Sequence, residues 1–299
     1  MSTAVPAASI EAVAAEAGVK LVRTRAEVRA WVARQRAAGK RVGLVPTMGY
    51  LHAGHLSLVS RARERADAVA MSIFVNPLQF GPTEDLERYP RSLERDLALA
   101  GGQGTELVFA PPVGEMYPGG EPRVSIVPDE EIGGWLDGGS RPGHFRGVLT
   151  VVAKLFGIFT PDVAVFGQKD WQQATLIRRM VADLDMAVEV DVAPIVREPD
   201  GLAMSSRNVY LSAGERASAL ALSRSLVHAQ ALYAAGERSA AVLRAAVWKA
   251  LGAPGVEPEY AEVAHPHTLA PVESAAPGTL VAVAARVGST RLIDNALLA

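Results

Sequence analysis

Cysteine is absent from this chain of 299 residues. Its absence excludes disulfides and thiolate metal sites, leaves histidine and carboxylate side chains as available metal ligands, and is typical of a reducing compartment. Long apolar runs are missing too. The longest, from Gly147 to Thr160, is interrupted by Lys154 and is shorter than the roughly 20 residues of a membrane-spanning helix. We therefore expect a soluble, cytoplasmic protein.

An excess of charge of one sign is also absent. The chain carries 30 Lys and Arg against 32 Asp and Glu, which gives a formal net charge of -2. Such a chain has no overall attraction for nucleic acid or anionic membranes, so any anion must be bound by a local arrangement of groups. With 49% hydrophobic and 21% charged residues the composition is that of a globular protein, and the length favours two unequal domains.

The first 18 residues are rich in alanine and contain glutamate but no lysine or arginine, unlike a signal or transit peptide. We expect residues 1–18 to form a poorly ordered leader.

From residue 41 to about 192, apolar runs with strand character alternate with helical patterns. This alternation is typical of βαβ units and predicts an α/β fold, a Rossmann-like doubly wound parallel sheet. The expected strands are 41–46, 68–75, 106–110 and 162–166. The expected helices are 54–67, 149–159 and one that begins at Asp170, where Asp170 and Gln173 have the spacing of a capping box.

The pattern changes after Pro194. A loop leads into a long alanine-rich helix from about Ser212, which has capping-box spacing with Glu215. A second helix is expected at 239–251, and strands near 257–263 and 279–286. We therefore predict a Rossmann-like domain over residues 19–193 and a smaller α+β domain over residues 194–299.

A histidine-containing segment lies where the first predicted strand passes into a helix. It reads Pro46-Thr47-Met48-Gly49-Tyr50-Leu51-His52-Ala53-Gly54-His55. Strand ends of this kind and helix N-termini bind phosphates, and glycines let the backbone approach a ligand. Two imidazoles three residues apart can donate hydrogen bonds to a triphosphate as negative charge develops, without a metal pair. In isolation such histidines are more often helix caps or core residues, but this placement favours ligand binding.

Two further side chains lie near predicted strand ends. Gln79 is either a loop amide bonded to backbone or an amide that reads a substrate, since it offers both a donor and an acceptor. Lys169 stands at a helix start, where a cation is unfavourable beside the positive end of the helix dipole. It is either a solvated surface lysine or a contact for an anion.

Ser205, Ser206 and Arg207 combine two hydroxyls with a guanidinium, which suits phosphate oxygens but is also common loop composition. Arg141 and His144 flank a Pro-Gly turn. They are either solvated charges or lid residues that contact a substrate.

Together these segments resemble the sequence blocks of pantothenate synthetases, a branch of the HxGH nucleotidyltransferase superfamily. The histidine segment matches the signature Pro-Thr-Met-Gly-x-Leu-His-x-Gly-His, and the other blocks follow in the family's order at 74–80, 141–147, 166–173 and 204–208. The resemblance covers about residues 20–299.

The resemblance implies a ligase reaction in two steps. ATP and (R)-pantoate give pantoyl adenylate and pyrophosphate, and β-alanine then attacks to release pantothenate and AMP. The implied catalytic residues are His52, His55, Lys169, Ser205, Ser206 and Arg207. The implied ATP contacts are Pro46, Thr47, Met48, Gly49, His52, Gly54, His55, Gly167, Lys169, Asp170, Val196, Met204, Ser205, Ser206 and Arg207. The implied substrate contacts are Met48, Asn76, Gln79, Arg141 and Gln173.

The resemblance also implies that the 204–208 loop closes over the triphosphate, that Mg²⁺ assists by bridging phosphates, and that the chain forms a homodimer through its larger domain. No metal ligand is assigned, and the expected partners are ATP, pantoate and β-alanine rather than nucleic acid or membrane. Two positions depart from the family pattern: Ala53 replaces a usual acidic residue, and Gln168 replaces a frequent glutamate. Two alternatives stay open: a nucleotidyltransferase that moves AMP or CMP onto a phosphorylated acceptor, and a nucleotide sensor without turnover.

Overall fold

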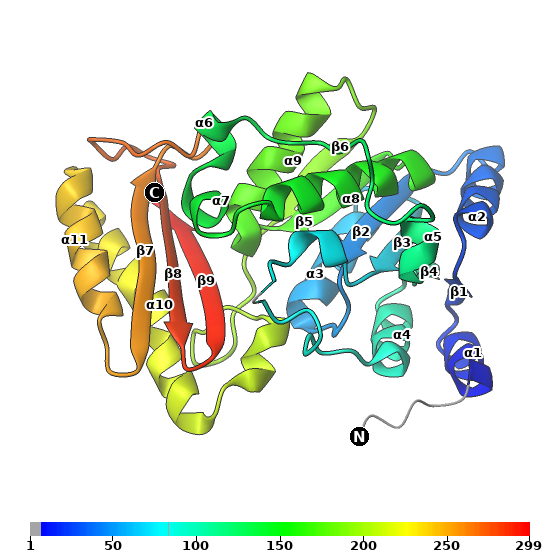
Figure 1. Ribbon diagram of the computed structural model, residues 1–299, viewed down its shortest axis with the longest axis horizontal. Helices are drawn as coiled ribbons and strands as arrows, with labels where there is room; N and C mark the ends of the chain where they lie inside the picture. The colour runs from blue at the N-terminus through cyan, green and yellow to red at the C-terminus, as the bar shows by residue number, and fades with distance from the viewer. Residues whose placement is uncertain (1–6, 83) are drawn as a thin grey trace. The chain divides into compact units, whose positions relative to one another are not determined.

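The computed structural model describes residues 7–82 and 84–299 and contains a six-stranded sheet in the order β1-β4-β3-β2-β5-β6 (Figure 1). Every neighbouring pair in it is parallel. The strands are β1 Lys20–Val22, β2 Val42–Thr47, β3 Ala68–Ile73, β4 Leu107–Phe109, β5 Val163–Gly167 and β6 Glu189–Ala193. The four strands expected from the sequence are confirmed as β2 to β5. The edge strands β1 and β6 lack the continuous burial of the central strands, so they carry no apolar run that would have revealed them.

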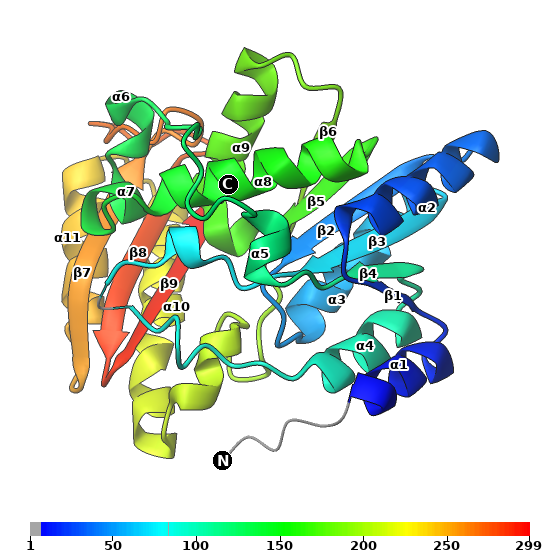
Figure 2. The ribbon, with the colours of Figure 1, turned by 45° about the vertical axis from the view of Figure 1, so that its right-hand side comes forward.

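Helices cover both faces of this sheet, as Figure 2 shows, and confirm the doubly wound fold. On one face the core joins strand residues such as Met71 and Val165 to apolar residues of α1, α3 and α4. On the other face lie α2 and α8, and Phe159 of α8 makes an edge contact with Phe109 of β4. The helices are α1 Ala7–Glu16, α2 Arg25–Ala37, α3 Ala53–Arg63, α4 Leu93–Gly102, α5 Val113–Met116, α8 His144–Phe159 and α9 Trp171–Asp183. Thus α8 begins five residues before its predicted start, and α3 ends four before its predicted end.

The expectation of a poorly ordered leader over residues 1–18 is wrong where the structure describes it. Residues 7–16 form α1, and Ala14 is only 2% exposed. Partly buried Ile10 and Val13 pack against the same core. Alanine has a high helix propensity, and these apolar residues recur on one side of the helix. Residues 1–6 lie outside the described part of the chain.

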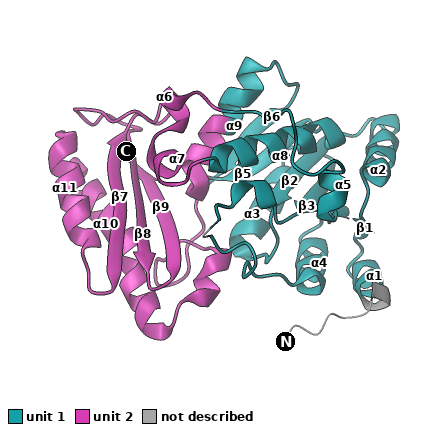
Figure 3. Cartoon of the chain, in the orientation of Figure 1, with its two compact units in different colours: residues 1–127, 143–167, 177–193 teal, residues 128–142, 168–176, 194–299 magenta. Residues whose placement is uncertain are grey.

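The chain divides into two compact units (Figure 3). Unit 1 comprises Met1–Val127, Gly143–Gly167 and Ile177–Ala193, and unit 2 comprises Pro128–Pro142, Gln168–Leu176 and Pro194–Ala299. Unit 2 therefore includes two segments that precede residue 194 in the chain. Among the described residues, no helix combines the length and apolar character needed to cross a membrane.

Unit 2 is built on an antiparallel sheet in the order β7-β8-β9 that packs against two helices. Its elements are α6 Glu130–Gly133, α7 Leu136–Ser140, η2 Gln168–Asp170, η3 Ser206–Tyr210, α10 Ala213–Ala234, α11 Ala240–Leu251, β7 Val256–Ala264, β8 Leu280–Val287 and β9 Thr290–Leu297. The capping box of α10 is confirmed, because Ser212 Oγ accepts the Glu215 N–H and Glu215 Oε2 accepts the Ser212 N–H. Strand β9 was not predicted, because it contains the polar pair Asp294 and Asn295, residue types that strands usually avoid.

Candidate functional site

Strand β2 marks the point where the strand order of the unit 1 sheet reverses. From β2 the chain moves outward through β3 and β4, whereas β5 and β6 lie on the opposite side of β2. Ligands of doubly wound sheets bind beside such a point, at the carboxyl ends of the strands. Strand β2 ends at Thr47 and β5 ends at Gly167. The predicted ATP contacts Pro46, Thr47 and Gly167 are therefore at the edge of the sheet where a ligand is expected.

A tight turn follows β2, and it requires glycine at its second residue. Gly49 has φ of 84° and Tyr50 has φ of 49°, so two successive residues adopt left-handed backbone. A Cβ atom on Gly49 would lie 2.9 Å from Ile73 Cγ2 and 3.0 Å from Asp96 Oδ2. Thr47 Oγ1 accepts the Gly49 N–H at 3.2 Å and donates to the Ser72 carbonyl at 2.8 Å. The turn is thus held against the end of β3.

A buried carboxylate holds the other side of this turn. Asp96 of α4 is 1% exposed, and its oxygens accept the N–H groups of Tyr50 and Leu51, each at 2.7 Å. Burial raises the pKa of the Asp96 carboxyl above its usual range, and the two N–H bonds oppose that rise. Sequence reasoning missed this residue. The available signal was its position among Leu97 and Ala100 on the buried face of α4.

The two histidines begin α3, with His52 at the N-cap. His52 Nδ1 accepts the Gly54 N–H at 3.2 Å, and His55 Nδ1 accepts the His52 N–H at 3.3 Å. Their ring centroids are 4.0 Å apart. A ring nitrogen that accepts an N–H is unprotonated, so each neutral ring carries its proton on Nε2. Helix capping through Nδ1 is therefore compatible with hydrogen-bond donation through Nε2, and donation to a phosphate stays a prediction.

Three predicted substrate contacts, Met48, Asn76 and Gln79, come together where β2 and β3 end. Asn76 caps η1, Pro77–Gln79, and is 1% exposed. Asn76 Nδ2 donates to Gln79 Oε1 at 3.0 Å, and Gln79 Nε2 lies 3.2 Å from Met48 Sδ. The amide of Gln79 is thereby oriented beside the turn that follows β2.

Residues outside the predicted set support this amide cluster. Tyr117 donates its hydroxyl hydrogen to Asn76 Oδ1 at 2.8 Å, and burial raises the pKa of Tyr117, which keeps it a neutral donor. Asn76 Nδ2 also donates to the Gly147 carbonyl at 3.1 Å. A Cβ atom on Gly147 would lie 2.2 Å from the Leu78 carbonyl oxygen, so only glycine allows α8 to approach η1 this closely.

His144 and Arg141 have different surroundings. His144 is the first residue of α8, is 8% exposed, and places Nδ1 2.8 Å from the Gln79 carbonyl oxygen. The reading of His144 as a solvated charge is therefore wrong, because the start of α8 packs against η1. Arg141 follows α7 in unit 2, and its N–H donates to the Asp137 carbonyl.

Three further predicted site residues of unit 2 lie in η2 and at the start of α9. Lys169 and Asp170 lie in η2, and Lys169 Nζ is 3.9 Å from Asp170 Oδ2, the outer limit of an ion pair. Gln173 lies in the first turn of α9, which starts at Trp171. The capping box between Asp170 and Gln173 stays a prediction.

The loop of two serines and an arginine, residues 205–207, follows a short hairpin of unit 2 in which Arg197 pairs with Ala203. The Met204 N–H donates to the Val196 carbonyl at 3.0 Å. Ser205 caps η3, and its Oγ accepts the Arg207 N–H at 3.2 Å. Ser206 is 6% exposed. This geometry fixes the backbone of the loop, and the contacts of these residues with ATP stay a prediction.

Comparison with known proteins agrees with this geometry. Residues 20–297 match the family model described as Pantoate-beta-alanine ligase. The chain is 54% identical to the pantothenate synthetase of Thermoanaerobacter sp. (strain X514) over 272 residues, which are 91% of this chain and 95% of the relative. It is 56% identical to the pantothenate synthetase of Anaeromyxobacter dehalogenans (strain 2CP-C), with 90% of this chain and 96% of that one covered.

Solved structures give the same result. The crystal structure of pantothenate synthetase from Thermus thermophilus matches with a TM-score of 0.88 and 47% identity, covering 93% of this chain and 99% of that one. The pantoate-beta-alanine ligase of Francisella tularensis, crystallised with Beta-gamma ATP and Beta-alanine, matches with a TM-score of 0.76 and 30% identity, covering 93% and 97%. This chain belongs to the pantoate-beta-alanine ligase family.

Proposed function

We propose that this chain joins (R)-pantoate to β-alanine in two steps at the expense of ATP. A pantoate carboxylate oxygen attacks the α-phosphorus of ATP, and pyrophosphate leaves. The β-alanine nitrogen then attacks the acyl carbon of pantoyl adenylate, and AMP leaves with the bond's electron pair. The observation that carries this proposal is the oriented pair His52 and His55, which follows a glycine turn at the switch point in a chain of this family.

Charge stabilisation at the phosphates is assigned to four side chains. His52 and His55 donate hydrogen bonds through Nε2 as charge develops on the triphosphate, and this role is supported by the bonds that hold each Nδ1. Lys169 and Arg207 add positive charge, with Ser205 and Ser206 as further donors. Covalent catalysis is not required, because the reaction needs in-line positioning of two reactants and neutralisation of charge. The remaining ATP contacts are those that the resemblance implies, and closure of the 204–208 loop stays a prediction.

Pantoate is assigned to the amides Gln79 and Gln173, together with Met48, Asn76 and Arg141, as the family resemblance implies. A substrate that carries hydroxyl and carboxylate groups would lose hydrogen bonds in a purely apolar pocket, whereas an amide offers both a donor and an acceptor. The hydrogen bond from buried Asn76 to Gln79 supports this assignment, because it fixes the orientation of the Gln79 amide.

Magnesium is proposed to arrive as part of the MgATP substrate. In the described residues, no group of three or more histidine and carboxylate side chains is arranged to hold a metal ion. Mg²⁺ commonly keeps several waters and binds through substrate phosphates, where it neutralises charge.

Assembly as a homodimer and a cytoplasmic location also stay predictions.

The catalytic role of His55 is tested by His55→Ala. Loss of one donor to developing negative charge lowers rates by about 10²–10³-fold, so pantoate-dependent ATP–pyrophosphate exchange should fall by that factor. His265→Ala is a matched control, because His265 Nδ1 also accepts two backbone N–H groups, in a turn of unit 2. A folded His55→Ala protein that retained exchange would contradict the assignment.

Product analysis separates this function from its alternatives. The protein is incubated with ATP, pantoate and β-alanine, and the products are identified by mass, with each acid omitted in turn. The ligase forms AMP and pantothenate only when both acids are present. A nucleotidyltransferase would leave AMP or CMP attached to a phosphorylated acceptor, and a sensor would form no product.

A further inference from the structure

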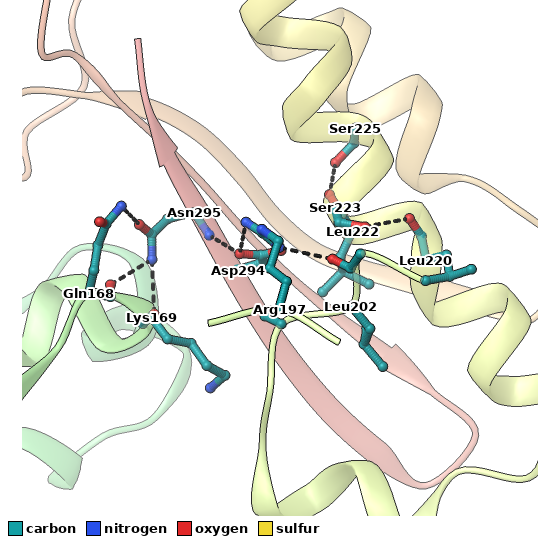
Figure 4. A network of polar contacts seen from close by, with 12 residues as sticks. Gln168, Lys169, Arg197, Leu202, Leu220, Leu222, Ser223, Ser225, Asp294 and Asn295 are labelled. Atoms are coloured by element: carbon teal, nitrogen blue, oxygen red, sulfur yellow. Dashed lines mark hydrogen bonds and ion pairs between the residues drawn. The ribbon is translucent and has the colours of Figure 1, made fainter. Parts of the chain in front are cut away.

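Two adjacent polar residues of β9 are almost completely buried. Asp294 and Asn295 are each 3% exposed, although β9 is an edge strand of the unit 2 sheet. Successive side chains of a strand point to opposite sides, so the two residues reach different segments of the chain (Figure 4). Both of those segments belong to unit 2 and carry residues assigned above to ATP.

Asn295 holds the turn that carries Lys169. Its Nδ2 donates to the carbonyl of Gln168 at 3.0 Å and to the carbonyl of Lys169 at 2.9 Å. Its Oδ1 accepts from Gln168 Nε2 at 3.3 Å. Both amide hydrogens and the amide oxygen of Asn295 are therefore directed at η2, and they fix the backbone from which the Lys169 side chain extends.

Asp294 holds the hairpin that precedes the serine-arginine loop. Its carboxylate accepts two parallel bonds from Arg197, at 2.6 Å and 3.0 Å, and also the Asn295 N–H at 2.8 Å. Arg197 Nη1 donates as well to the Gly201 carbonyl at 3.2 Å. Arg197 is paired with Ala203 across this hairpin, which leads into Met204 and η3. Strand β9 packs against both η2 and η3.

The ion pair of buried Asp294 with partly exposed Arg197 contributes little net stability, because the cost of removing the carboxylate from water offsets much of the attraction. The two-pronged Arg197 bond does define a geometry closely. We propose that Asp294 and Asn295 act as a positioning pair for adenylation, holding the Lys169 turn and the Ser205–Arg207 loop in one arrangement. This inference rests on the phosphate-binding roles proposed above for Lys169 and Arg207.

The two half-reactions should respond differently when the pair is disturbed. Adenylation requires the triphosphate to be held in line with the pantoate carboxylate, and a displacement of about 1 Å can reduce such a rate about 100-fold. Attack of β-alanine on pantoyl adenylate involves neither the β- nor the γ-phosphate. A residue that only stabilises the fold would not distinguish the two steps.

Asn295→Ala and Arg197→Lys test the proposal in the full-length chain. Pantoate-dependent ATP–pyrophosphate exchange should fall about 10- to 100-fold in kcat. Formation of pantothenate from supplied pantoyl adenylate and β-alanine should change by less than about threefold, since that step does not need the displaced groups. Arg197→Lys keeps a positive charge beside Asp294 but cannot make two parallel bonds, so it carries the test if Asn295→Ala does not fold.

Leu292→Ala is the matched control on the same strand. Leu292 is 5% exposed and packs in the apolar core of unit 2, so its truncation lowers the unfolding midpoint without removing a hydrogen bond to η2 or the hairpin. It should leave the ratio of the two half-reaction rates unchanged. An equal fall in both half-reactions for Asn295→Ala and Arg197→Lys, in step with their unfolding midpoints, would overturn the proposal.

Lys169→Ala and Arg207→Ala, measured in parallel, distinguish a failure of the proposed phosphate-binding roles from a failure of the positioning pair alone. If neither lowers exchange, the phosphate roles of these residues are wrong, and the positioning pair is overturned with them. If both lower exchange but the Asn295 and Arg197 variants do not, only the positioning pair is overturned.

Discussion

Asp96 directs both oxygens of its carboxylate at the backbone that precedes His52. An acidic residue in the first turn of a helix is ordinarily explained by the helix dipole, and Glu94 fits that explanation. Asp96 differs because it is buried and its partners lie in the turn that follows β2. The left-handed backbone at Gly49 and Tyr50 orients two successive N–H groups toward one carboxylate. The position of the proposed catalytic histidines therefore depends on a residue outside the histidine motif.

Replacing Asp96 by asparagine should disturb this turn. Asparagine has one acceptor oxygen, and its NH₂ group would face a backbone N–H that then lacks an acceptor. The free energy of unfolding should fall by about 1–3 kcal/mol in urea titrations, and pantoate-dependent exchange should slow about tenfold or more. Glu94→Gln is the control and should change stability by less than about 0.5 kcal/mol. Equal behaviour of the two variants would mean that Asp96 acts only through the helix dipole.

At the scale of elements, the contact of α8 with η1 positions the Gln79 amide. Gly147 lets the Leu78 carbonyl approach the helix backbone, and His144 contacts the Gln79 carbonyl from the same helix. Helix α8 therefore supports the Asn76 and Gln79 amides that are proposed to bind substrate, although its interior consists mainly of buried apolar residues. The sequence block at 141–147, which resembles a block of the family, ends at Gly147, the residue that makes this contact.

Gly147→Ala should displace η1, because the added Cβ overlaps the Leu78 carbonyl. The expected losses are about 1–3 kcal/mol of stability and tenfold or more in kcat/KM for pantoate. Gly157→Ala in the same helix is the control. Nothing lies within 4 Å of its added Cβ, so it should be neutral or stabilise by about 0.5–1 kcal/mol. Unchanged pantoate kinetics in Gly147→Ala would contradict the role given to this contact.

The hairpin before η3 has a charged support that should depend on pH. Arg216 contacts both Glu198 and Asp200 at 2.7 Å. Burial alone would raise the pKa of Glu198, but the bonds from Arg216 and Asn208 outweigh it, and the pKa is lowered. The Leu202 N–H and Arg216 lower the pKa of Asp200. Carboxyls with a lowered folded-state pKa stabilise the fold above their usual pKa, and this contribution is lost as pH falls through the folded values.

Arg216→Met should therefore lower the urea midpoint at pH 7, where Glu198 and Asp200 would be left as neighbouring negative charges. The difference from the unsubstituted chain should shrink as pH falls below the usual glutamate value of 4.5 toward 3. Arg179→Met is the control, because the Arg179–Asp183 pair is exposed and lies within one helix. A difference that stayed constant from pH 7 to 3 would exclude the carboxyl contribution.

The strands that the sequence did not reveal lack an unbroken apolar run. Strands β1 and β6 lie at sheet edges and are partly exposed, so their composition is not the apolar run of a covered strand. Strand β9 contains Asp294 and Asn295, whose burial is compensated by partners far away in the sequence. Strands β2 to β5 were predictable because their own residues carry the apolar signal.

At the scale of the whole molecule, long-range hydrogen bonds assign two early segments to unit 2. Arg291 of β9 binds the Asp137 carboxylate at 2.6 Å, and partly buried Tyr260 donates to the same carboxylate at 3.2 Å. Trp171 Nε1 donates to the Pro266 carbonyl at 2.8 Å. The segments 128–142 and 168–176 thus belong to unit 2 through side chains, although they precede the bulk of that unit in the chain.

The N-terminal helix is a part of unit 1 that can be tested directly. Ala14→Asp would place an uncompensated charge in its core and should lower the free energy of unfolding by about 3 kcal/mol or more. Ala15→Asp adds the same group at an exposed position of the same helix and should change it by less than about 0.5 kcal/mol. Similar urea midpoints for both variants would restore the view of this segment as a leader outside the core.

The sequence by itself determined the fold class, the family and the main chemical groups, because residue type, spacing and hydrophobic period are local properties of the chain. Only the tertiary structure decided which residues hold those groups in place. Asp96 is 46 positions from Tyr50, and Asn295 is 127 positions from Gln168. No local pattern records a hydrogen bond across such separations, since it exists only after the intervening chain has packed.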